Sequence, residues 1–125
     1  TDDPRGTLFC MSNTWGDRSQ DMAVCESFML KEIDRAKEMG VDIVQIDDGW
    51  LTGITANSRR KKGGVWEGFY ADNSDFWKVN AERFPNGLEP VVEKAKNYGL
   101  EMGLWFGPDS SNDFENYQKD IETLN

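Results

Sequence analysis

The stretch VDIVQIDDGWLTG, residues 41–53, decides how the chain is interpreted. Its first part, VDIVQI, has the length and β-branched content of a strand, and it breaks abruptly into two aspartates, a glycine and a tryptophan. Strand side chains alternate between faces, so Asp47 and Asp48 point in different directions unless the chain bends at Gly49. Such a pair cannot easily flank a scissile bond at the roughly 5–9.5 Å separation that two opposed carboxylates need. The geometry therefore favours holding a ligand over cutting one.

A weak internal repeat surrounds this stretch. AKEMGVDIVQIDDGW (36–50) and AKNYGLEMGLWFGPD (95–109) share the frame Ala-Lys-x-x-Gly-apolar-acidic. The glycine of each copy, Gly40 in the first and Gly99 in the second, suits the left-handed position that closes a helix. The repeat predicts helices over about residues 22–39 and 87–98, each followed by a strand, over about 41–47 and 100–106.

The ends of the chain extend this alternation. We expect a first strand over about residues 7–15 and a last helix over about 113–124, with Asn112 or Asp113 as its N-cap. One face of that helix carries Phe114, Tyr117, Ile121 and Leu124. Alternating strands and helices predict an α/β fold with parallel strands and right-handed crossovers. Three strands leave both sheet edges open, and Leu, Ile, Val and Phe make up only 26 residues, so we expect a piece of a larger (β/α) protein.

Composition excludes several classes of function. The net charge of −9 argues against a nucleic-acid or anionic-membrane partner. The chain has no histidine, so histidine-based catalysis and metal ligation are excluded within it. Apolar runs are shorter than a membrane span, the N-terminus lacks a signal-peptide pattern, and Cys10 and Cys25 leave the compartment unresolved.

Residues 51–86 form an unusually long connection between a strand and a helix. Its basic run, Arg59–Lys62, is interpreted as a solvated loop tip, with a phosphate or polyanion site as the weaker alternative. Its aromatic residues favour loop packing over a ligand platform: Trp66, Phe69, Tyr70, Phe76 and Trp77.

Each expected strand ends in polar or aromatic residues. The tips carry Asn13, Trp15 and Asp17, then Asp47, Asp48 and Trp50, and finally Trp105 and Asp109. Ligands of α/β proteins bind at this carboxyl edge, so the tips predict a polar pocket with aromatic walls. Two alternatives stay open: a capped strand end with solvated acids, and a magnesium site like that of receiver domains. A receiver, however, needs two further strands.

The motifs MSNTWGD, VDIVQIDDGW and RFPNGLEPVVEKAKNYGLEMGLWFGPD resemble the first three βα units of melibiase-type α-galactosidases, which are clan D glycoside hydrolases of the family 36 kind. The resemblance covers about residues 8–120, and the ordered set is more specific than any one motif. One departure is Trp105-Phe106-Gly107-Pro108-Asp109, where the family often reads Trp-Phe-Glu-Pro-Glu. This departure leaves the subfamily and the exact substrate open.

The resemblance implies that residues 1–125 are a fragment of a TIM-barrel catalytic domain, about three units of a (β/α)8 barrel. It implies a retaining hydrolase of terminal α-galactosides, without cofactor or metal. Asp47 and Asp48 would bind sugar hydroxyls, and Trp105, Trp50 and Trp15 would wall the pocket. The nucleophile and the acid/base residue belong to later strands of the family, so no catalytic residue is assigned and the isolated chain is expected to be inactive.

Two other interpretations are compatible with the sequence. The chain could be a non-catalytic carbohydrate-binding or self-associating module, whose open sheet edges pair in a homo-oligomer. The less favoured one is the receiver-like, magnesium-binding α/β domain.

Overall fold

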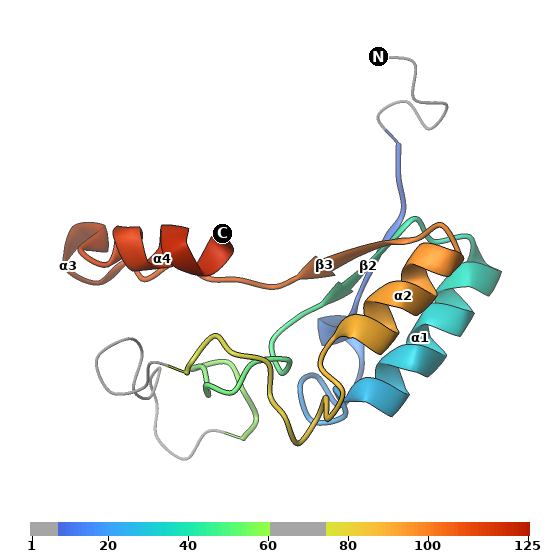
Figure 1. The fold of residues 1–125 in the computed structure, drawn as a ribbon, viewed down its shortest axis with the longest axis horizontal. Coiled ribbons are helices and arrows are strands. Elements are labelled where there is room, and N and C mark those ends of the chain that lie inside the picture. The colour runs from blue at the N-terminus through green and yellow to red at the C-terminus, as the bar shows by residue number, and fades with distance from the viewer. Residues whose placement is uncertain (1–7, 61–74) are drawn as a thin grey trace.

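The computed structural model describes residues 8–60 and 75–125, which form three strands with helices between and after them (Figure 1). The elements, in order, are β1 (Met11–Asn13), the 3-10 helix η1 (Thr14–Gly16), α1 (Glu26–Met39), β2 (Ile43–Ile46), α2 (Glu89–Asn97), β3 (Glu101–Leu104), α3 (Ser111–Phe114) and α4 (Tyr117–Leu124). Several residues singled out in the sequence lie outside the described ranges: Lys61, Lys62, Trp66, Phe69 and Tyr70.

The strands form one sheet in the order β1-β2-β3, and both pairs are parallel, as the alternating pattern predicted. The register sets Asn13, Gln45 and Gly103 side by side across the sheet. Val44 and Ile46 are buried, whereas their neighbour Gln45 is only half-buried. Alternation therefore gives the sheet one apolar face and one face with a polar row.

Helices α1 and α2 lie side by side on the same side of the sheet (Figure 1). The helical residues in the core are Met29, Ile33, Ala36, Val91 and Ala95. A polar link joins the two helices, because Lys94 Nζ donates to Asp34 Oδ2 at 2.7 Å and the Tyr98 hydroxyl donates to Asp34 Oδ1 at 2.7 Å. The apolar face of the sheet is thus covered, and the face with the polar row carries no helix among the described residues.

The predicted glycine stops are confirmed. Gly40 and Gly99 adopt left-handed conformations, with φ of 77° and 74°. Helix α1 begins at Glu26, later than the predicted residue 22, because the preceding residues are tied elsewhere. Their carbonyl groups, at Asp21 and Val24, accept hydrogen bonds from the Arg83 side chain instead of helical N–H groups.

All three strands are shorter than predicted, and α2 spans Glu89–Asn97 rather than about 87–98. Two further differences have a local cause. Strand β1 stops at Asn13, because its side-chain Oδ1 accepts from the Trp15 N–H at 2.7 Å and turns the chain into η1. The predicted last helix is split, and the N-cap of α4 is Asn116 rather than Asn112 or Asp113. Those two residues have left-handed φ of 49° and 57°, which breaks the helical ladder.

Helix α4 extends away from the α1–α2 layer (Figure 1). The apolar face expected for the last helix is exposed, at Phe114 of α3 and at Tyr117, Ile121 and Leu124 of α4. No helix within residues 8–60 and 75–125 has the length and apolar character needed to cross a membrane.

The two described arms of the long connection lie together beneath the carboxyl ends of β2 and β3 (Figure 1). Leu51 pairs with Val79 in an antiparallel bridge, and the Gly53 N–H donates to the Phe76 carbonyl at 2.9 Å. The connection is therefore organised around its own hydrogen bonds, next to the strand tips.

Candidate functional site

Three strand tips meet on the face of the sheet that the described helices leave open. Asp47 and Trp105 each follow by two positions the register partners Gln45 and Gly103. The Trp105 N–H donates to the Ile46 carbonyl at 2.8 Å, so the pairing of β2 with β3 continues to this level. By alternation, Asp47 and Trp105 extend the face that carries the polar row. Carboxyl ends of parallel strands are where α/β folds place ligands.

Asp47 is half-buried and held in one orientation. Its Oδ2 accepts from Asn13 Nδ2 at 3.0 Å, and its Oδ1 accepts from the Asp48 N–H at 2.7 Å. Its own N–H donates to Thr14 Oγ1 at 2.9 Å. Each carboxylate oxygen has about two lone-pair directions, and the described residues use one on each. Asp47 is therefore a half-buried hydrogen-bond acceptor held in a fixed orientation.

Asp48 has different surroundings, as the alternation argument predicted. It is 1% exposed, and its Oδ2 accepts from the hydroxyl of Thr55. Its Oδ1 has no hydrogen-bond partner among the described residues. Burial raises the pKa of Asp48, and the charges of Asp21 and Asp47 act in the same direction, against the Thr55 hydrogen bond and the charge of Arg60.

Gly49 makes the bend that separates the two aspartates from the following loop. Its φ of +121° is disfavoured for residues with a side chain. A Cβ at this position would lie 3.1 Å from Arg83 Nη1 and 3.1 Å from Asp21 Cβ. The tight approach of Arg83 and Asp21 to the end of β2 therefore depends on glycine here.

Asp21 forms a buried polar centre that the sequence did not indicate. It is 0% exposed and accepts from the Ser58 hydroxyl, from the Arg59 N–H at 3.0 Å and from Arg60 Nε at 3.2 Å. Burial alone would raise the pKa of Asp21, but these hydrogen bonds outweigh it and lower the pKa. Arg59 is exposed, as expected for a loop tip, whereas the expectation is wrong for Arg60, which folds inward. The partners are 37–39 residues apart, so no local pattern could reveal them.

The tryptophans near the strand tips differ in burial and in the contacts they make. Trp50 is 7% exposed, and its Nε1 donates to the Trp105 carbonyl at 3.0 Å. The Trp77 ring lies 5.8 Å from that of Trp105 and 6.2 Å from that of Trp50, between centroids. Trp105 and Trp15 are only half-buried. The buried Trp50 thus supports Trp105 from within the protein, the half-buried Trp77 packs near both rings, and Trp105 and Trp15 keep accessible surface.

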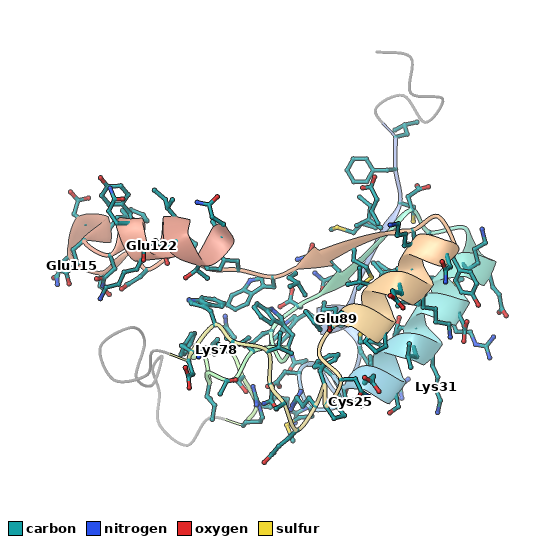
Figure 2. The ribbon with its side chains drawn as sticks, in the orientation of Figure 1. Cys25, Lys31, Lys78, Glu89, Glu115 and Glu122 are labelled. Atoms are coloured by element: carbon teal, nitrogen blue, oxygen red, sulfur yellow. The ribbon has the colours of Figure 1, made fainter. Side chains whose placement is uncertain are left out.

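The other acidic strand tips do not join this group. Asp17 is exposed and accepts from the Ser19 N–H at 2.8 Å. Asp109 accepts from Asn116 Nδ2 at 2.8 Å in the segment that leads to α4. Figure 2 shows side chains gathered under the strand tips with Lys78 at their rim, while Glu122 of α4 projects from a separate part. Among residues 8–60 and 75–125, no group of three or more acidic or cysteine side chains is arranged to hold a metal ion.

The chain is similar to a known family over nearly its whole length. The model of the family described as Melibiase matches residues 9–121. The alpha-galactosidase of Escherichia coli is 34% identical over 85 residues, which are 68% of this chain and 10% of that enzyme. The chain thus spans about a tenth of the length of this curated relative.

Solved structures share the fold. The GH36 alpha-galactosidase AgaA from Geobacillus stearothermophilus, in a complex with 1-deoxygalactonojirimycin, matches with a TM-score of 0.59 at 27% identity, over 91% of this chain and 14% of that one. The same enzyme in a complex with stachyose matches with a TM-score of 0.57 at 25% identity, over the same shares. The predicted fold is confirmed: the three parallel strands and their helices are part of a (β/α)8 barrel.

Proposed function

The chain belongs to the Melibiase family, and on that basis we propose that it is the sugar-binding part of a retaining α-galactosidase. The complete protein hydrolyses terminal α-galactosides by double displacement, and this chain holds the terminal galactose. The relative from Escherichia coli is an α-galactosidase, and AgaA has been solved with 1-deoxygalactonojirimycin and with stachyose. These matches support both the reaction class and a saccharide partner.

The observation that carries the proposal is the pre-oriented, half-buried carboxylate of Asp47 at the tip of the central strand. Trp105 follows the neighbouring strand β3, and Trp15 follows β1 and is tied to Asp47 through the side chain of Asn13. A charged acceptor binds hydroxyl groups strongly, and aromatic faces stack on the C–H faces of a pyranose. Between them, these side chains offer both kinds of contact to one sugar ring.

The remaining proposed contacts are arranged around this centre. Asp48 adds a second acceptor through Oδ1, which has no partner among the described residues. Trp50 completes the wall from behind, because it fixes the backbone of Trp105. The proposal therefore uses all five residues that the family resemblance indicated: Trp15, Asp47, Asp48, Trp50 and Trp105.

We assign no catalytic residue to the chain. Asp47 faces Asn13, whereas Asp48 is buried against Thr55, so the two carboxylates do not face each other across one substrate bond. We propose that residues 1–125 are a fragment of the catalytic domain and that the nucleophile and the acid/base residue lie on other strands of the barrel. The chain by itself then binds the sugar without cleaving it.

Binding of methyl α-D-galactopyranoside, followed by tryptophan fluorescence, tests the proposal. We expect a saturable response to this sugar and a much weaker one to methyl α-D-glucopyranoside, its epimer at C4. Asp47→Asn removes a charged acceptor and should weaken binding about tenfold or more. Asp42→Asn is the matched control, because Asp42 lies before the other end of β2 and accepts from the Cys10 N–H at 2.8 Å.

Equal responses to the two sugars, or equal losses in the Asp47 and Asp42 variants, would overturn the proposed binding site. Turnover of a chromogenic α-galactoside by the isolated chain would instead overturn the assignment of the catalytic residues to other strands.

A second candidate function, a self-associating module, is favoured by an apolar groove of about 380 Å³ beside α2 and β3. Its lining includes Leu88, Val91, Val92, Met102 and Leu104. Light scattering across a concentration series tests this candidate, since association should raise the apparent mass. A constant monomer mass would exclude it over that range.

A further inference from the structure

Asp48 is a buried carboxylate whose two oxygens have different environments. Its Oδ2 accepts from the Thr55 hydroxyl, and its Oδ1 has no partner among the described residues. A buried carboxylate is costly unless hydrogen bonds compensate it. Thr55 supplies the one hydrogen bond to this carboxylate that the described residues provide.

The Thr55 hydroxyl donates one hydrogen bond and accepts another. Thr55 is 0% exposed, and its Oγ1 accepts from the Asn57 N–H at 3.2 Å. A hydroxyl carries a single hydrogen, which Thr55 directs to Asp48. The hydrogen bond from Thr55 therefore fixes the position of one carboxylate oxygen, Asp48 Oδ2.

The loop that carries Thr55 is itself anchored. The Ser58 hydroxyl and Arg60 Nε both donate to Asp21, which is fully buried. The Ser58 N–H also donates to the Thr55 carbonyl at 3.2 Å, which closes the turn between them. Residues 55–60 thus form a clamp that is fixed at one end to Asp21 and at the other to Asp48.

We infer that Thr55 is a positioning residue: its hydrogen bond to Oδ2 fixes the orientation of the Asp48 carboxylate, whose buried Oδ1 is left for a hydroxyl group of the galactoside. This inference rests on the proposed function. Asp21 and Asp47 oppose the ionisation of Asp48, and Arg60 favours it. The charge of Arg83 also interacts with that of Asp48. None of them replaces the directed hydrogen bond from Thr55.

The test measures the affinity for methyl α-D-galactopyranoside as a function of pH. Thr55→Val keeps the side-chain shape, removes the hydroxyl and should weaken binding about tenfold or more. Losing this hydrogen bond raises the pKa of Asp48. The acidic limit of binding, which is the pH below which the affinity falls as Asp48 becomes protonated, should therefore move to higher pH. Thr55→Ser should restore both properties. Thr52→Val is the matched control, because the exposed Thr52 hydroxyl donates to the Lys78 carbonyl at 3.0 Å.

The inference is overturned if Thr55→Val leaves the affinity and the acidic limit unchanged, or if Thr55→Ser fails to restore them. If the valine variant does not fold, Thr55→Ala and Thr55→Ser provide the same comparison. A wild-type chain that does not distinguish the galactoside from the glucoside would overturn the proposed function and this inference together. Selective wild-type binding with no effect at Thr55 would overturn the inference alone.

Discussion

Replacing Arg83 by methionine should destabilise the chain more than any surface substitution. Its Nη1 donates to the carbonyl groups of Asp21, Val24 at 2.9 Å and Gly49 at 3.3 Å. These carbonyls belong to the segment before α1 and to the bend after β2. One guanidinium group therefore joins segments that the sequence separates.

The magnitude follows from how many bonds one nitrogen can make. Nη1 carries two hydrogens, so the three acceptors share about two full hydrogen bonds. All three acceptor residues are buried, and each carbonyl left without a partner costs about 1–3 kcal/mol. Because Arg83 is half-buried and water can replace part of the loss, we expect a decrease of about 2–4 kcal/mol in the free energy of unfolding. That is a large share of the roughly 5–15 kcal/mol typical of a domain.

Urea denaturation, followed by tryptophan fluorescence and far-ultraviolet circular dichroism, measures this loss. The midpoint should fall while the slope with urea stays constant, as for a change in stability alone. Arg83→Lys should lie between the wild type and Arg83→Met, because an ammonium group can serve some of the carbonyls. Arg35→Met is the control, since its ion pair with Glu38 is exposed and should matter little.

A loss below about 1 kcal/mol, or one no larger than that of the Arg35 variant, would contradict this prediction. Either result would mean that water satisfies the three carbonyls as well as Arg83 does.

Two further predictions concern the same region. Burial raises the pKa of Asp48, so the carboxyl contributes stability below its unfolded pKa and loses it as the pH rises through the folded value. Asp48→Asn should therefore raise the melting temperature at neutral pH and change it little near about pH 2.5, and equal effects at both would contradict this. Gly53→Ala would place a Cβ against the buried Phe76 ring and should cost about 1–3 kcal/mol in urea denaturation. Gly16→Ala, with no neighbour within 4 Å, is the control, and equal losses would refute the packing argument.

Local patterns were sufficient for the architecture. The glycines at the helix ends, Gly40 and Gly99, depend only on backbone conformation, and the structure gives both a positive φ. The alternation of strand side chains likewise predicted that Asp47 and Asp48 would differ in surroundings, as their contacts with Asn13 and Thr55 show. Both features depend only on residues that are neighbours in the sequence, so they can be predicted without knowledge of the tertiary fold.

The polar support of the site was not predictable in the same way. Asp21 meets Ser58 and Arg60 across 37 and 39 residues, and nothing in the neighbourhood of either partner marks the pairing. A basic run is normally solvated, so the sequence predicts a surface position for Arg60. The late start of α1 has the same origin, because Arg83, far away in the sequence, binds the carbonyls that precede it. Contacts of this kind depend on the tertiary fold and escape any local rule.

The adjacent aspartates acquire different roles because neighbours on a strand meet different parts of the protein. Asp47 is held from within the sheet, by Asn13 and Thr14 at the end of β1. Asp48 is held from the loop, by Thr55. Two acceptors with separate supports can bind different hydroxyl groups of one sugar, yet they cannot approach one bond from opposite sides. The same alternation that makes the pair unsuitable for cleavage makes it suitable for recognition.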